Sequence, residues 1–145
     1  MPSKVYFTNV RTKSGLSLVD KVGALFDAAG FGKLLSKGDL AAIKLHVGEP
    51  GNLAYIQPPL VRRVVDKVKK AGARPFLTDA NTLYVGRRAN AVDHTISALE
   101  NGFSYATVGA PFIVADGLMG HEYVKVPIDG VRLKEVRIGA AIAQA

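Results

Sequence analysis

Three apolar runs rich in strand-forming residues alternate with segments of helical periodicity, and each run ends in a polar loop. The runs cover residues 40–47, 75–78 and 112–115. Strands that alternate with helices are joined by right-handed crossovers and build a mostly parallel sheet. The carboxyl ends of parallel strands meet at one edge, where such folds bind ligands. The sequence therefore predicts an α/β fold whose three polar loops share one edge of the sheet.

Three helices are predicted from apolar residues that recur at helical spacing. They cover residues 18–29, 58–70 and 91–99. The first follows Ser17, a favourable N-cap residue, and the second opens with two prolines, which suit a first helical turn. Glycine or Asn-Gly follows each helix and predicts its end. These helices are expected to be the crossover connections of the sheet.

The two ends of the chain complete the predicted fold. Residues 4–10 contain several β-formers and predict a first strand, which gives a mostly parallel sheet of about four strands. Residues 124–133 alternate apolar and polar around Asp129-Gly130, a favoured two-residue hairpin turn, and predict a C-terminal antiparallel hairpin. Residues 138–145 look like the opening of a helix. We expect residues 1–145 to form a single α/β domain.

Composition limits the classes of function. A chain of 145 residues with 48% apolar content can bury a real core. It contains no cysteine, so it offers no thiolate for a zinc site or an iron-sulfur cluster, and a metal would depend on His, Asp or Glu. No apolar run approaches the length of a membrane span, so we expect a cytoplasmic protein without a membrane partner.

The net charge of +7 favours an anionic partner, such as a small anionic ligand. Nucleic acid is the less favoured partner. Lys67, Lys69 and Lys70 end a predicted helix, where cations complement the helix dipole and lie in solvent. No recognition motif or row of aromatic residues accompanies them.

The loop after the first apolar run contains His46, Glu49 and Asn52. A histidine and a carboxylate three residues apart in a glycine-containing loop can share a metal ion or a proton. They can equally serve the loop itself, His46 by a hydrogen bond to a neighbouring loop and Glu49 as a cap. Both interpretations stay open, and all three residues are candidate ligand-binding residues.

The loop after the second run contains Asp79, Asn81, Arg87 and Arg88. Asp79 comes directly after the predicted strand and is a candidate ligand-binding residue. Asn81 is a second candidate, although short polar residues also bond to the backbone of their own turn. The two arginines can clamp a phosphate or a carboxylate, and Arg87 is taken as a ligand-binding candidate. At least one of the two is expected to be exposed to solvent.

Asp116 occupies the matching position after the third run. Gly117 and Gly120 would let backbone amides approach an anion there, but Asp-Gly is also an ordinary turn, so both interpretations stay open. His121 adds a possible metal ligand. His94 lies inside a predicted helix beside an aspartate and is expected on the surface.

His46, Asp79 and Asp116 occupy equivalent ends of three parallel strands, so the sheet itself is expected to bring them into one crevice. An imidazole and two carboxylates match an open divalent-metal site or an acid–base pair. We therefore predict a possible metal site formed by these three residues and His121, without an assignment of the metal. No nucleophile elbow, dinucleotide fingerprint or Walker loop is present, so the sequence leaves open whether the chain is an enzyme.

A longer pattern runs through the same loops. Its residues are Ile43-Lys44-Leu45-His46, Gly48-Glu49, Gly51-Asn52, Pro75 to Asp79, Asn81 to Tyr84, Gly86-Arg87, Asp93-His94, Glu100 to Phe103 and Ala115 to Leu118. The pattern resembles the family named domain of unknown function 362, whose members often carry the label of uncharacterised iron-sulfur centre proteins. Members usually continue into a second half, and many add a ferredoxin-like module with cysteines for two four-iron clusters. By this resemblance the chain is expected to be the amino-terminal portion of that architecture.

The resemblance implies a redox-associated or ligand-binding domain without an agreed reaction. Our leading prediction is a domain that holds a small anionic or metal-linked ligand and works with an iron-sulfur partner domain or the second half of the architecture. The alternative is a non-catalytic scaffold or docking module for an iron-sulfur electron-transfer partner. A basic nucleic-acid-binding module is less favoured. A sheet left uncovered by a missing half would also favour a homo-dimer.

Overall fold

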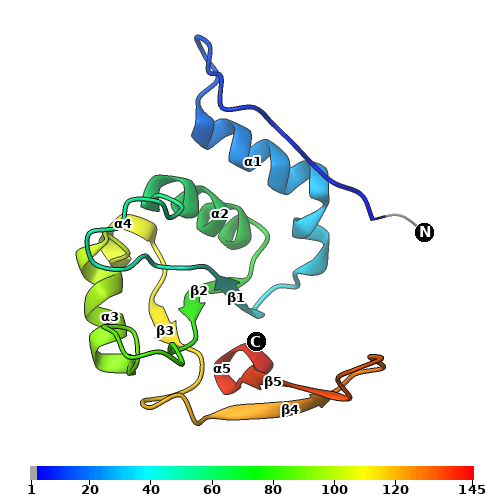
Figure 1. Cartoon of the computed structure of the whole chain (residues 1–145). Coiled ribbons are helices and arrows are strands. Elements are labelled where there is room, and N and C mark those ends of the chain that lie inside the picture. The colour runs from blue at the N-terminus through cyan, green and yellow to red at the C-terminus, as the bar shows by residue number, and fades with distance from the viewer. Residues whose placement is uncertain (1–2) are drawn as a thin grey trace.

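The parallel sheet has three strands. A computed structural model describes residues 3–145, so Met1 and Pro2 of the predicted domain lie outside the described residues. The strands β1 (Leu40–Lys44), β2 (Arg74–Asp79) and β3 (Phe112–Val114) lie side by side in the order β1-β2-β3 (Figure 1). The predicted α/β class is confirmed, but the sheet contains three parallel strands rather than about four.

The difference arises at the N-terminal segment. Residues 4–10 form no strand and run as an extension beside α1 (Leu18–Ala29) (Figure 1). As a result β1 is an edge strand, with a paired neighbour on one side only. The prediction of a first strand was wrong because β-type side chains favour an extended backbone but do not supply a hydrogen-bonded neighbour.

The three predicted helices are confirmed, but α1 is not a crossover connection, because no strand precedes it within residues 3–145. In α1 the Ser17 side chain accepts a hydrogen bond from the Asp20 N–H at 3.1 Å, and Gly30 ends the helix at a φ of +73°. Helix α2 (Pro58–Lys70) begins with its two prolines and packs against α1 and β2. Helix α3 (Ala91–Glu100) is capped by Asn90 and packs against β3. The starts of α1 and α2 have the local chemistry that the sequence indicated, whereas the Asn90 cap of α3 was not predicted.

Two short helices complete this part of the chain. They are η1 (Phe31–Leu34), a 3₁₀ helix after α1, and α4 (Tyr105–Val108), which lies between α3 and β3. Both are too short to give a periodic apolar pattern. The core is formed where α2, α3 and the strands meet, and its fully buried members include Val47, Val65, Leu77, Ala98, Phe103 and Val108. This packing fixes the ends of β1 and β2 that carry the polar loops.

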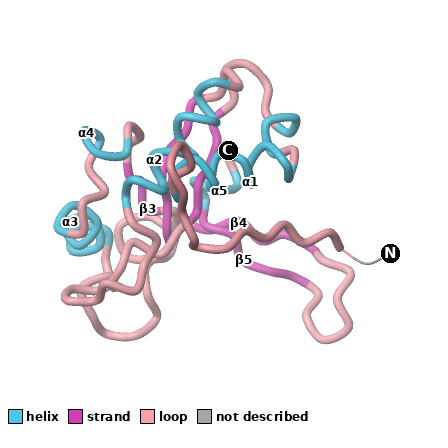
Figure 2. Tube along the Cα trace, turned by 90° about the horizontal axis from the view of Figure 1, so that it is seen from above, coloured by secondary structure: helices cyan, strands magenta, loops and turns pink. Residues whose placement is uncertain are grey.

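The C-terminal residues form a second sheet. Strands β4 (Tyr123–Pro127) and β5 (Glu135–Gly139) pair antiparallel, and Figure 2 shows their hairpin extending away from α3 and α4. The hairpin prediction is confirmed, but its turn is longer than Asp129-Gly130. The connection is closed by the Ile128 N–H, which donates to the Lys134 carbonyl at 2.9 Å.

Helix α5 (Ala140–Ala143) follows β5 directly. The helix predicted from residue 138 therefore begins at Ala140, because Ile138 and Gly139 complete the ladder of β5. None of the helices in the described part of the chain is long and apolar enough to cross a membrane.

Candidate functional site

A polar cluster at the carboxyl edge of the sheet centres on the guanidinium of Arg88. This side chain comes from the loop between β2 and α3 and is only 4% exposed. Its Nε lies 2.7 Å from Glu49 Oε1, and its Nη1 lies 3.0 Å from Asp79 Oδ2. Its Nη2 contacts His46 Nε2 at 2.9 Å and donates to the Tyr84 hydroxyl at 2.8 Å. One buried cation therefore ties the loop after β1 to the end of β2.

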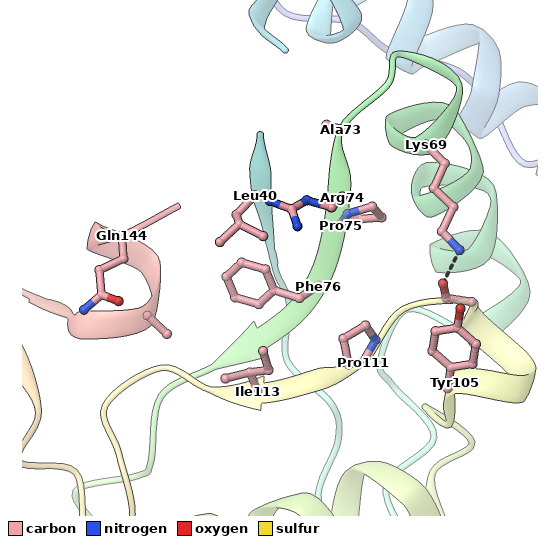
Figure 3. Close-up of a pocket in the computed structure, with 12 residues that line it drawn as sticks. Leu40, Lys69, Ala73, Arg74, Pro75, Phe76, Tyr105, Pro111, Ile113 and Gln144 are labelled. Atoms are coloured by element: carbon pink, nitrogen blue, oxygen red, sulfur yellow. Dashed lines mark hydrogen bonds between the residues drawn. The ribbon is translucent and has the colours of Figure 1, made fainter. Parts of the chain in front are cut away.

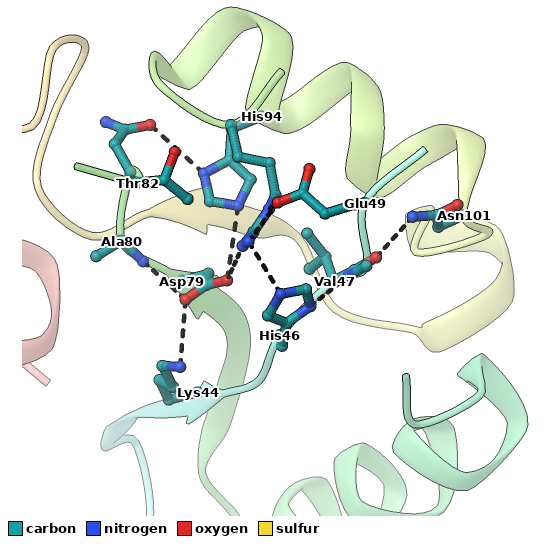
Figure 4. Close-up of polar contacts among 12 residues, drawn as sticks. Lys44, His46, Val47, Glu49, Asp79, Ala80, Thr82, His94 and Asn101 are labelled. Carbon is teal, nitrogen blue, oxygen red and sulfur yellow. Dashed lines mark hydrogen bonds and ion pairs between the residues drawn. The ribbon is translucent and has the colours of Figure 1, made fainter. Parts of the chain in front are cut away.

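Asp79 is the last residue of β2 and the innermost anion of the cluster. Figure 4 shows Lys44 and His94 on either side of its carboxylate, with Lys44 Nζ 3.3 Å from Oδ1 and His94 Nε2 3.7 Å from Oδ2. The Ala80 N–H also donates to Oδ1 at 3.0 Å. Burial acts to raise the pKa of Asp79, but His94 and the Lys44 ammonium outweigh it and hold this pKa below its ordinary value of 3.8. Asp79 is therefore a carboxylate at neutral pH.

Glu49 is the outer anion of the cluster. Its side chain is 32% exposed, against 7% for that of Asp79, so it covers the guanidinium from the solvent side. Glu49 Oε1 also accepts a hydrogen bond from the Tyr84 hydroxyl at 2.5 Å. Bonds from Arg88 and Tyr84 hold the pKa of Glu49 below its ordinary value of 4.5.

These two lowered pKa values predict an acid-sensitive fold. The unfolded chain binds protons at the ordinary values, so the stabilisation is fully present above about pH 4.5 and is lost as pH falls through the lower folded values. We expect urea denaturation to show a free energy of unfolding that decreases below about pH 4.5, with a shallower decrease in Glu49→Gln. Parallel pH profiles for the two proteins would contradict this assignment.

The structure brings only some of the predicted site residues together. His46, Glu49 and Asp79 all contact Arg88. Asp116 lies next along the same edge, where its carboxylate accepts the Asn81 N–H at 3.0 and 3.1 Å. The side-chain oxygen Oδ1 of Asn81 lies 3.4 Å from Nδ1 of His94. Asp116 is thus joined to the cluster through Asn81 and makes no contact with the guanidinium.

Three further candidates make local or surface contacts. Asn52 accepts the Ala54 N–H at 2.8 Å within its own exposed turn. Arg87 pairs with Glu100 of α3, with Nη1 2.6 Å from Oε2. His121 is exposed in the segment before β4. The structure places none of these three side chains in contact with Arg88.

Residues 41–145 match the family described as Domain of unknown function (DUF362). This chain belongs to that family. The resemblance noted in the sequence is therefore confirmed, and the DUF362 match includes every residue of the Arg88 cluster, whereas residues 4–10 and α1 precede it. No curated protein and no solved structure matches the chain.

His94 is the site residue of this DUF362 domain that the sequence placed wrongly. It was predicted on the helix surface, but its side chain is fully buried and its ring lies 5.4 Å from that of Phe112. The sequence position of His94 could have predicted its burial, because Ser97 and Ala98 lie three and four residues later and share the buried face of α3. The sequence predicted only that at least one of Arg87 and Arg88 is exposed to solvent. Arg87 is the exposed residue, and Arg88 is buried.

The predicted metal ligands do not form a group. Within residues 3–145 no cluster of three or more His, Asp or Glu side chains is arranged to hold a metal ion. His46, Glu49 and Asp79 instead surround a guanidinium, which supplies the positive charge. Metal binding by His46, Asp79, Asp116 and His121 stays a prediction.

An apolar hollow of about 510 Å³ lies away from this cluster, beside the start of β2 (Figure 3). Leu40, Phe76, Pro111 and Ile113 are among its lining residues. None of the residues that line it belongs to the Arg88 cluster. The polar site is therefore a close-packed hydrogen-bonded network at the sheet edge, and its accessible part is the side covered by Glu49.

Proposed function

We propose that this DUF362 domain binds a small anion, a carboxylate or a phosphate group, at the carboxyl edge of β1 and β2. The observation that carries the proposal is the fixed guanidinium of Arg88, whose solvent side is covered by the partly exposed carboxylate of Glu49. Guanidinium groups recognise carboxylate and phosphate oxygens through paired hydrogen bonds. An anionic ligand takes the position of Glu49 on the outer side of Arg88.

The contacts of His46 support an additional acceptor at this place. The Gly48 N–H donates to Nδ1 at 2.9 Å, and Arg88 Nη2 faces Nε2 at 2.9 Å. A neutral imidazole has one lone pair for such donors, because its other nitrogen carries a proton. The ring therefore cannot accept from both donors. For Arg88 Nη2 the alternative acceptor is Glu49 Oε1 at 2.6 Å, and in the proposed complex the bound anion takes its place.

Lys44 provides the second positive charge. Its Nζ lies beside Asp79 while its side chain stays 60% exposed at the end of β1. An ammonium group there attracts an anion and can bond to it without leaving Asp79, because it carries three donors. The proposed ligand thus contacts Arg88 first, with Lys44 and His46 around it.

Titration with inorganic phosphate and with acetate tests this proposal. In calorimetry we expect the wild-type domain to bind phosphate, Lys44→Ala to bind it roughly two- to fivefold more weakly, and Glu49→Gln to bind it more tightly. Lys125→Ala is the matched control, because Lys125 is similarly exposed at 56% and paired with Glu135 at 3.0 Å in the hairpin.

Two results would overturn the proposal. One is the absence of phosphate and acetate binding in both the wild-type protein and Glu49→Gln. The other is an equal loss in Lys44→Ala and Lys125→Ala, which would indicate a general response to the net charge of +7. A parallel titration with Mg²⁺ and Zn²⁺ tests the metal prediction separately. Docking to an iron-sulfur partner and binding to nucleic acid stay predictions.

A further inference from the structure

Strand β1 presents an unpaired edge to solvent. Backbone groups of alternate residues in a parallel strand point to opposite sides. The Arg74 N–H donates to the Asp39 carbonyl at 2.7 Å, and the Leu45 N–H donates to the Thr78 carbonyl at 3.1 Å, so the odd-numbered residues face β2. The N–H and C=O groups of the even-numbered residues point outward, and residues 3–145 supply no hydrogen-bond partner for them.

An apolar groove of about 660 Å³ lies beside this edge. Its walls come from α1, η1, β1 and α2, and its lining includes Leu25, Phe26, Leu34, Ile43 and Val64. Exposed strand edges next to apolar surface are templates for pairing with another strand. The edge and the groove together are therefore suited to an extended apolar segment.

The chain itself carries such a segment in residues 4–10, which we call the arm. Val5, Phe7 and Val10 are 88%, 86% and 79% exposed, and Tyr6 reaches the margin of the groove. The base of the arm is held on α1, where Lys21 Nζ donates to the Asn9 carbonyl at 3.0 Å. The arm is thus a strand-forming segment without a strand partner, and of its side chains only Tyr6 lines the groove.

The handedness of the fold defines how an arm fits the edge. Helix α1 packs beside α2, which joins β1 to β2. With the same right-handed crossover, the strand that precedes α1 belongs at the free edge of β1 and runs parallel to it. An arm that pairs with β1 is therefore expected to lie on its free edge and to run parallel to it.

We propose that two copies of this chain exchange arms, so that the arm of each copy adds to β1 of the other as a fourth parallel strand. The occupant is a second copy because the Lys21 contact holds the base of each arm on α1, where Val5 and Phe7 stay exposed to solvent. Each copy offers one donor segment and one acceptor edge. A twofold dimer satisfies both, because each β1 edge then pairs with one arm.

Sedimentation equilibrium with three variants tests the exchange. The donor variant carries Val5→Asp and Phe7→Asp at exposed positions of the arm. The acceptor variant carries Ala42→Pro, which removes an N–H that points outward from β1 and makes no hydrogen bond to β2. Val131→Asp is the control, because Val131 is 97% exposed in the hairpin connection. We expect dimers for the wild-type protein and the control, and monomers for each defective variant alone.

A mixture of the two defective variants gives the sharper result. The acceptor variant still donates its arm, and the donor variant still offers its edge, so the mixture is expected to form a dimer through one exchange. A monomeric wild-type protein at every concentration, or a donor variant that still dimerises, overturns the proposal. Should Ala42→Pro fail to fold, hydrogen exchange decides, because the wild-type Ala42 amide must become protected as the protein concentration rises. Protection that does not depend on concentration contradicts exchange between copies.

Discussion

Replacement of Arg88 with Met is expected to destabilise the domain by about 3–5 kcal/mol, the usual cost of removing one partner from a buried ionic network. The change leaves the carboxylate of Asp79 buried with one cation fewer, and it leaves Glu49 without its main partner. Urea denaturation at pH 7 measures the loss. The physical reason is desolvation, since the buried carboxylate regains no hydration in exchange for the cation that it loses.

Arg87→Met is the matched control for this prediction. Arg87 is the neighbouring residue, and its ion pair with Glu100 is exposed on both sides, so only a small change is expected. Asp79→Asn in the Arg88→Met background should recover part of the lost stability, because it removes the uncompensated charge. A double-mutant cycle without coupling between the two positions would show that Arg88 does not act through Asp79.

Gly48→Ala is expected to cost about 2–5 kcal/mol and to weaken phosphate binding. Gly48 has a φ of +86°, where an alanine is disfavoured by about 1–2 kcal/mol. The new Cβ would also lie 2.5 Å from the ring of Tyr55 and 2.7 Å from Asn101 Nδ2, and overpacking adds about 1–3 kcal/mol. Because Gly48 lies between His46 and Glu49, any shift that relieves these contacts moves the site.

Gly51→Ala separates the two parts of this effect. Gly51 lies in the same loop at a φ of +78°, but an added Cβ meets no atom within 4 Å. Its substitution is therefore expected to show the backbone cost alone, about 1–2 kcal/mol, with phosphate binding retained. Equal losses of stability at Gly48 and Gly51 would mean that the contacts with Tyr55 and Asn101 relax without cost.

The sequence predicted the elements whose signals are local. Helix α2 illustrates this, because the apolar stripe that includes Val61, Val65 and Val68 is the face that is buried. The hairpin strands were also predicted from alternation, whereas their connection was not, since the turn depends on the register between β4 and β5. The arm has the composition of a strand, but whether it becomes one depends on a neighbour that composition does not contain.

The site was predicted less completely because its contacts are distant in the chain. The positions of His46, Glu49 and Asp79 at the carboxyl edge followed from the order of strands and loops. The residue that joins them did not, since Arg88 lies 39 positions from Glu49 and 42 from His46. The buried state of His94 likewise depends on Phe112, which reaches α3 only in the folded chain.

The position of Glu49 on the guanidinium has a consequence for selectivity. Any free anion competes with a carboxylate tethered by a short loop, whose effective local concentration is on the order of millimolar or higher. In the proposed site, a ligand with one acidic group is therefore expected to bind the wild-type domain more weakly than it binds Glu49→Gln. The proposed site is therefore expected to favour ligands whose additional groups also contact the amine of Lys44 or the ring of His46. The carboxylate of Glu49 cannot make these contacts while it is bonded to Arg88.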